Sequence, residues 1–331
     1  MRLVAFCKRL YHNIFTRWVM YRIKNILQKL TALVLLPVLC SQPALQVSAA
    51  SNGYSYLLMP TQITKINNTY YIVDSNHNQI IYSDDLSREL RDWNVMTRKL
   101  KEPHALCSDG DIYMVTDTEN DRILTFAKGY DSFRLLQTFE NVGVRPHYVS
   151  YDPVDKLFYA WSSMTGEMYI YQRIGDSLSL QLLEIKAIPE LAHCYVRSFT
   201  IAGDVILFPA VELSSIMMVD KSTFEVLQTY PVSPDIAGMV QISIVDRYFF
   251  LTVSTNLQYD LSASTVLRAR TLEDFTTGSF ENLYHLFGNN GTPYFISYFD
   301  GSYYMIHENA SPNIYRFHAT DGRIYDIRGL F

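Results

Sequence analysis

Three histidines recur in similar local surroundings and could together hold a metal ion. His104 and His147 each follow a proline and lie 43 residues apart, and His193 follows at a looser spacing. Neutral imidazoles from three positions can bind zinc or a similar ion and leave a fourth coordination position for water or substrate. A rigid turn that is capped by a histidine side chain explains the same recurrence without any metal. On the sequence alone both interpretations stay open.

Two arginines and a series of acidic loops accompany these histidines. Arg145 and Arg197 lie close to His147 and His193 in the chain, where a guanidinium can grip a carboxylate or sulfate or simply form a salt bridge. Asp117 is a further candidate ligand-binding residue, from one of three polar loops: 74–78, 117–121 and 308–313. The oxygens of these loops suggest calcium. Their spacing lacks the D-x-D-x-D-G pattern of a dedicated calcium loop, however, and an aspartate that stabilises a turn explains them too.

A repeat positions all of these residues. In its first three units a proline recurs every 43 residues, and the residues after each proline align without gaps at first. Runs of Tyr, Phe, Ile and Val between turn residues predict four strands in the second unit: 105–108, 112–116, 122–126 and 133–139. Six units begin at or near Pro60, Pro103, Pro146, His193, Ala237 and Pro293.

Units of this length with four strands each predict an all-β protein, a six-bladed β-propeller with four-stranded antiparallel blades that spans residues 51–331 as one domain. One such sheet cannot bury both of its faces alone, so it must pack against neighbours around a ring, and the 25 Tyr and 18 Phe residues suit the wedges between blades. In this strand order the start of each inner strand and the loop between the second and third strands share one face. The histidines and acidic loops should therefore converge at the mouth of the central channel.

The second unit resembles an NHL-type propeller repeat. The resemblance rests on three stretches, Pro103-His104-Ala105-Leu106, Asp109-Gly110-Asp111-Ile112-Tyr113 and Thr116 to Ile123, and it is weaker in the other units. NHL-type propellers are mostly six-bladed. Because they serve as enzymes, ligand binders and docking platforms alike, the resemblance implies a fold rather than a function.

The Pro-His pairs are also distantly similar to motifs of the peptidyl-α-hydroxyglycine α-amidating lyases, which are six-bladed propellers with metal-binding histidines. This similarity implies a metal-dependent lyase or hydrolase with its ion at His104, His147 and His193, although only the first two match the Pro-His form. The other catalytic residues of that family have no counterpart that can be placed here. We therefore favour a non-enzymatic propeller without a cofactor, which binds a small ligand, a glycan or a protein partner at the channel mouth. The alternative is an enzyme that uses zinc, or a site for calcium.

Residues 1–50 have the composition of a secretory signal peptide that is cleaved. They contain seven basic residues and no acidic one, an apolar run from Thr31 to Leu39, and small residues at 47–50. The apolar run is too short to span a bilayer, and Cys40 lacks the small preceding residue of a lipidation motif. We expect a secreted or extracytoplasmic protein with no stable membrane anchor. Loss of the leader changes the net charge from −5 to about −12, which makes nucleic acid an improbable partner.

Two cysteines, Cys107 and Cys194, remain after the leader is removed. They fall in the inner-strand regions of the second and fourth units, which are not neighbours in the ring. Their Cα atoms should be farther apart than the roughly 7 Å that a disulfide bond tolerates. We expect the two thiols to stay unpaired.

N-terminal sequencing of the exported protein should give a start between residues 48 and 53. The small residues there follow the apolar run at the distance that signal peptidases require, and translation from either Met1 or Met20 yields the same mature chain. An intact leader, or a lipid attached to Cys40, would contradict this prediction.

Overall fold

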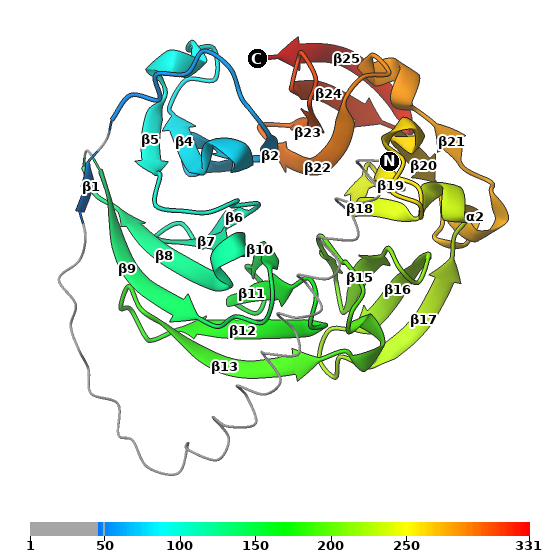
Figure 1. Ribbon diagram of the computed structural model, residues 1–331, viewed down its shortest axis with the longest axis horizontal. Coiled ribbons are helices and arrows are strands. Elements are labelled where there is room, and N and C mark those ends of the chain that lie inside the picture. The colour runs from blue at the N-terminus through cyan, green and yellow to red at the C-terminus, as the bar shows by residue number, and fades with distance from the viewer. Residues whose placement is uncertain (1–45, 49, 131) are drawn as a thin grey trace, which may run out of the picture. The chain divides into compact units, whose positions relative to one another are not determined.

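Antiparallel β-strands make up most of the regular structure. The computed structural model describes residues 46–48, 50–130 and 132–331. Its strands form six separate sheets around a central axis, with β2, β6, β10, β18 and β22 among the innermost strands (Figure 1). The six-bladed β-propeller predicted from the repeat is confirmed.

Each blade consists of four consecutive strands, which are numbered outward from the axis. The strands of the first three blades are β2 (Pro60–Ile66), β3 (Thr69–Asp74), β4 (Gln79–Ser83) and β5 (Asn94–Thr97); β6 (Leu106–Ser108), β7 (Ile112–Asp117), β8 (Arg122–Lys128) and β9 (Ser132–Glu140); and β10 (Pro146–Asp152), β11 (Leu157–Ser162), β12 (Glu167–Arg173) and β13 (Leu180–Ala187). Those of the last three are β14 (Thr200–Ala202), β15 (Val205–Ala210), β16 (Ser215–Asp220) and β17 (Val226–Pro231); β18 (Gly238–Val245), β19 (Tyr248–Thr255), β20 (Thr265–Ala269) and β21 (Glu281–Asn282); and β22 (Thr292–Phe299), β23 (Ser302–Glu308), β24 (Ile314–Thr320) and β25 (Arg323–Leu330).

Helical structure in the described residues is confined to short segments in the loops. These are α2 (Glu273–Thr277) and the 3-10 turns η1 (Ser75–His77), η2 (Leu90–Asp92), η3 (Thr118–Asn120), η4 (Pro189–Leu191), η5 (Pro234–Ile236), η6 (Leu261–Ala263) and η7 (Tyr284–Phe287). Within the described ranges no helix is both long enough and apolar enough to cross a membrane.

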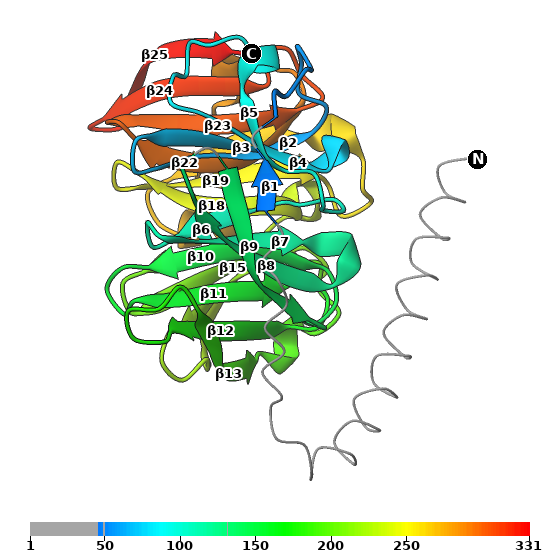
Figure 2. The same ribbon diagram turned by 90° about the vertical axis from the view of Figure 1, so that its left-hand side faces the viewer.

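The predicted leader lies outside the described residues except for 46–48 and Ala50. Residues Gln46–Ser48 form β1, which pairs antiparallel with the outer strand β9 of blade two (Figure 2). The carbonyl of Ala50 accepts a hydrogen bond from the backbone N–H of Val95 on β5, at 2.7 Å. Cleavage after residue 50 would remove β1 together with the carbonyl that accepts this bond.

The predicted strands of the second unit agree with β6 to β9 to within two residues at each end. The start of blade four differs from the prediction. Its inner strand β14 begins at Thr200 and not near His193, because η4 and a turn are inserted between blades three and four. This insertion breaks the regular spacing of the first three units. Cys107 and Cys194 are both free thiols, as expected.

Aromatic side chains fill the wedges between neighbouring blades. Between blades one and two, Tyr71, Tyr82 and Tyr113 surround Phe133, with ring centroids 5.2 to 6.1 Å from it. The hydroxyl of Tyr71 donates a hydrogen bond to that of Tyr113, at 3.3 Å. Edge-on contacts of this kind let large rings pack densely and also satisfy their polar ends.

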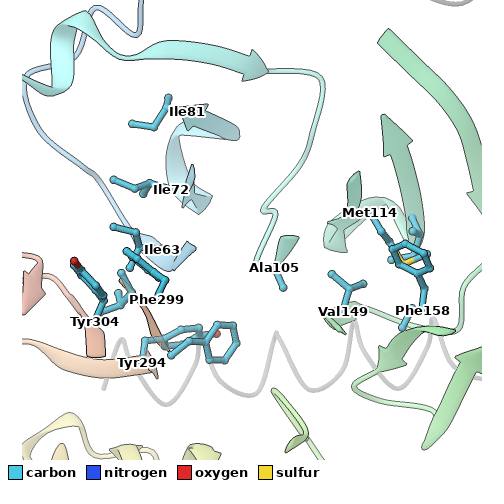
Figure 3. Packing of buried hydrophobic residues seen from close by; sticks show 14 of the residues in the cluster. Ile63, Ile72, Ile81, Ala105, Met114, Val149, Phe158, Tyr294, Phe299 and Tyr304 are labelled. Carbon is cyan, nitrogen blue, oxygen red and sulfur yellow. The ribbon is translucent and has the colours of Figure 1, made fainter. Parts of the chain in front are cut away.

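Aliphatic residues of blade one belong to a second hydrophobic cluster, separate from the one around Phe133. Ile63, Ile72 and Ile81 lie on three successive strands of blade one, and all three are fully buried (Figure 3). On the side of blade six they are accompanied by Phe299 and Tyr304, whose rings stack with centroids 4.0 Å apart. This cluster therefore joins blade one to blade six.

Hydrogen bonds between the inner strands fix how neighbouring blades are positioned relative to one another around the axis. Thr61 on β2 donates its hydroxyl to the carbonyl of His104, at 2.7 Å. The side-chain oxygen of Gln62 accepts from the backbone N–H of Leu106, and Gln241 on β18 accepts in the same way from Ile296 on β22, both at 2.7 Å. These bonds place Thr61, His104 and their counterparts at one level of the ring.

Blade one and blade six close the ring by side-chain contacts and do not share a strand. Lys65 forms an ion pair with Asp300 at 2.7 Å, and the hydroxyl of Tyr70 donates to the same carboxylate at 2.9 Å. Phe331, the C-terminal residue, packs edge-on against Trp93 of blade one, with ring centroids 5.6 Å apart. Because Trp93 is fully buried, its contact with Phe331 between blades one and six excludes water from the indole ring.

Trp93→Ala should lower the free energy of unfolding by about 3 to 5 kcal/mol, because it removes a buried ring from the closure of the propeller. Urea denaturation of the mature chain measures this. Tyr298→Ala is the matched control, since Tyr298 is 63% exposed and its loss should change stability by less than about 0.5 kcal/mol. Equal effects of the two substitutions would show that the closure does not depend on Trp93.

Candidate functional site

Two of the three predicted histidines meet near the axis, at the end of the ring where the inner strands begin. We call this end the histidine face. The rings of His104 and His147 have centroids 3.8 Å apart and are inclined by 33°, and both side chains are buried. They occupy equivalent positions in neighbouring blades. The 43-residue repeat predicts this convergence correctly.

Hydrogen bonds hold both imidazoles in the same tautomer. Nδ1 of His104 lies 2.8 Å from the carbonyl oxygen of Glu102, and Nδ1 of His147 lies 3.0 Å from that of Arg197. A carbonyl oxygen can only accept, so each Nδ1 carries the hydrogen and each Nε2 keeps a lone pair. The hydroxyl of Tyr195 lies 3.2 Å from Nε2 of His147 and donates to it, while Nε2 of His104 has no hydrogen-bond partner among the described residues.

Arg145 and Arg197 reach the same region and differ in their partners. Arg145 forms ion pairs with Glu119 and, at 3.7 Å, with Glu102. Arg197 donates to the hydroxyl of Ser254 at 2.8 Å and to the carbonyl of Met239 at 3.2 Å. Its guanidinium also lies over the ring of Tyr195, 4.8 Å from the centroid. Among the described residues, then, Arg197 contacts neutral groups only.

Tyr294 and Glu308 of blade six complete the group. Tyr294 follows a proline at the start of β22, as His104 does in blade two, and their ring centroids lie 6.4 Å apart. Glu308 ends β23 and is 9% exposed. Burial raises the pKa of Glu308 to about 8, although the charge of Arg197 acts in the opposite direction. The Glu308 carboxyl is therefore mostly protonated at neutral pH.

Together these side chains form the channel-mouth cluster: His104, His147, Arg145, Arg197, Tyr195, Tyr294 and Glu308. Burial, with the positive charge of Arg145 as a smaller cause, lowers the pKa of His104 to about 3. Burial, His104, Arg145 and Arg197 also hold the pKa of His147 well below its usual value. The cluster therefore contains two positive guanidiniums, two neutral imidazoles and a neutral acid. This charge distribution favours an anion over a cation.

The third predicted histidine, His193, does not take its expected position. It lies in an exposed turn, with φ at 70°, and its backbone N–H bonds to Met164 in the loop between β11 and β12. Because of the insertion before blade four, Arg197 and Ser198 occupy the positions equivalent to Pro103 and His104. The placement of His193 at the start of an inner strand was wrong.

Asp117 lies at the end of β7 and has a structural role. It is fully buried, and its carboxylate accepts hydrogen bonds from the backbone of Lys101 at 2.5 Å, from Asn120 at 2.9 Å and from Arg122 at 2.6 Å. With its oxygens used in this way, Asp117 fixes the loop that follows β7. The turn interpretation accounts for these contacts of Asp117, and its ligand role stays a prediction.

Neither Tyr195 nor Tyr294 was predicted from the sequence, and only Tyr294 has a signal in the repeat. Tyr294 stands after Pro293 as His104 stands after Pro103, so the repeat could have revealed it. Tyr195 lies in the insertion before blade four and has no counterpart in other units. Within the described residues no group of three or more His, Cys, Asp or Glu side chains is arranged to hold a metal.

Comparisons with known proteins show similarity of fold. No protein-family model matches the chain, and no curated protein matches its sequence. A protein from Bacteroides uniformis, provisionally named a 6-phosphogluconolactonase, is 14% identical, with a TM-score of 0.58 over 86% of this chain and 88% of its own. A protein from Bacteroides fragilis with the same provisional name is 13% identical, with a TM-score of 0.58 over 81% and 83%.

Hydrazine synthase from Kuenenia stuttgartiensis has a similar structure as well. It is 14% identical, with a TM-score of 0.56 over 85% of this chain and 80% of its own. At such low identity these similarities support the propeller and transfer no activity, because unrelated functions occur on the same fold.

The buried histidines should make the fold sensitive to acid. His104 has a lower pKa in the folded chain than the value of about 6.5 in the unfolded chain, so its contribution is complete above pH 6.5 and is lost as the pH falls toward 3. At pH 5 the loss should be about 2 kcal/mol. Urea titrations between pH 7.5 and 4.5 should thus show a shallower acid dependence for His104→Gln. His285→Gln, which changes an exposed histidine, should follow the parent protein. An unchanged slope for His104→Gln would refute this assignment.

Proposed function

We propose that the protein is an extracytoplasmic NHL-like β-propeller that binds a small anionic ligand at the channel-mouth cluster, without catalysis. The ligand would present a carboxylate, sulfate or phosphate group to Arg197. The observation behind this proposal is the partly buried guanidinium of Arg197, which has no carboxylate of the described residues within ion-pairing distance.

A buried positive charge without a counter-ion is costly for the protein. A guanidinium stays protonated at all physiological pH values, so the cost cannot be avoided by loss of its proton. Glu308, whose charge would favour Arg197, is mostly neutral at pH 7 because its pKa is about 8. An anion from solution would supply the missing charge, and paired hydrogen bonds to the planar guanidinium would orient it.

The neighbours of Arg197 suit such a ligand. The protonated Glu308 can donate a hydrogen bond, and the hydroxyl of Tyr294 can donate another. Arg145 adds positive charge from the start of the inner strand of the neighbouring blade three, although Glu119 and Glu102 partly neutralise it. Nε2 of His104 can accept a hydrogen bond from a hydroxyl elsewhere in the ligand. The resemblance of the repeat to NHL-type propellers, which include ligand binders, agrees with this role.

Isothermal titration of the mature chain with sulfate, phosphate and citrate should detect binding of at least one of these anions. Arg197→Gln should weaken it roughly ten- to a hundredfold, the range expected for a lost charge-assisted hydrogen bond. Arg247→Gln is the control, because the side chain of Arg247, in the β18–β19 hairpin of blade five, is 76% exposed and pairs with Asp321 of blade six. If no anion binds, or if the two variants behave alike, the proposal fails.

A second candidate function is a metal-dependent lyase or hydrolase whose ion is held by His104 and His147, without His193. The observation in its favour is the neutral Nε2 of His104, which keeps a lone pair and has no partner among the described residues. Elemental analysis of the purified mature protein distinguishes the two candidates. A stoichiometric transition metal that is lost in His104→Ala and kept in His285→Ala would favour the enzyme over the anion binder.

A further inference from the structure

A cavity lies toward the opposite end of the inner strands from the channel-mouth cluster. It has a volume of about 340 Å³ and is lined by the ends of the inner strands β10, β14 and β18 with Ile296 of β22. On β10 the order along the chain is His147, Tyr148, Ser150 and Asp152, so the strand leads from the channel-mouth cluster to this cavity. This volume lies in the range of small-molecule sites.

A layer of aromatic rings separates the two sites. Tyr148 contacts Phe199 and Phe295 edge-on, with centroids 5.3 and 4.9 Å away. Phe295 in turn packs against Tyr294, with centroids 4.5 Å apart. The cluster and the cavity can thus bind different ligands independently.

The polar side chains on the cavity wall are uncharged apart from Asp152, and hydrogen bonds within the protein satisfy only part of their donors and acceptors. The side-chain oxygen of Gln241 accepts from Ile296 and from the hydroxyl of Ser243, at 2.7 and 2.8 Å, and its amide nitrogen lies 3.4 Å from the hydroxyl of Tyr148. Ser150 has no side-chain hydrogen bond with any described residue, and its side chain is half-buried on the cavity wall. Hydroxyl and amide groups therefore remain free to donate to, and accept from, a ligand.

Charge on this wall is confined to one ion-paired carboxylate. Among the described residues Asp152 is the one charged residue that lines the cavity, and Lys221 pairs with it at 2.8 Å and also with Asp155 at 2.8 Å. The cavity also lacks the guanidiniums of the channel-mouth cluster. An anion would therefore gain nothing here, and a cation would compete with Lys221 for Asp152.

We propose that this cavity binds a neutral polyhydroxylated molecule, a sugar of one or two rings. The aromatic ring of Tyr148 and the side chain of Ile201 offer apolar surface for the C–H faces of the sugar. Ser150, Ser243 and Gln241 offer the hydrogen bonds that its hydroxyl groups require. This site is independent of the anion site proposed above.

Saturation-transfer NMR of the mature chain with D-glucose, D-galactose and maltose tests the proposal. At least one of these sugars should give a signal, and Ser150→Phe should weaken its binding at least tenfold by filling the cavity. Ser297→Phe is the matched control, because Ser297 holds the equivalent half-buried position on β22 and does not line the cavity. Thermal unfolding checks that both variants fold, and Ser150→Leu replaces Ser150→Phe if it does not.

Two further measurements separate this site from the first. Arg197→Gln should leave sugar binding unchanged, so failure of the anion proposal does not affect this one. D-glucuronate and D-glucosamine, which keep the ring of glucose and carry a negative and a positive charge, should bind more weakly than the neutral sugar. The proposal is overturned if no neutral sugar binds, if a charged counterpart binds better, or if Ser150→Phe and Ser297→Phe behave alike.

Discussion

Closure of the ring is the constraint on which the rest of this structure depends. A four-stranded sheet exposes two apolar faces, and each blade here covers its neighbours' faces with aromatic side chains such as Tyr71 and Phe133. The four core strands of every blade are consecutive in the chain, so no shared strand fastens the first blade to the last. That junction is held by Lys65 with Asp300 and by Trp93 with Phe331. Without this contact two blades would each leave an apolar face in water.

Because the blades form a ring, residues at equivalent positions of successive repeats become neighbours around the axis. His104 and His147 approach each other because both begin inner strands in adjacent units of equal length. The inner strands are also the most crowded part of the molecule, so polar side chains that begin them lose water. That loss of water keeps His104 neutral and Glu308 mostly protonated, while the guanidinium of Arg197 cannot give up its charge.

The blades share one strand arrangement but carry different side chains at equivalent positions, and these differences determine the chemistry of the channel. Equivalent positions at the histidine face hold Thr61, His104, His147, Ser198, Val240 and Tyr294, so each blade contributes a different group. One residue farther along the inner strands, the aromatic layer of Tyr148, Phe199 and Phe295 divides the channel. One end then has positive charge, and the other has neutral hydroxyl and amide groups. A single channel can in this way offer two sites with different preferences.

The repeat predicts six blades, their order of strands and the approach of His104 to His147, because these features depend on local periodicity and on regular spacing. The other members of the channel-mouth cluster could not be predicted in this way. The insertion before blade four places His193 in an exposed turn and Arg197 at the channel mouth. No local sequence pattern shows at which residue the regular repeat begins again after such an insertion. Burial of Asp117 and the convergence of Tyr195, Tyr294 and Glu308 likewise join segments that are distant in the chain. Such contacts depend on how the whole ring closes.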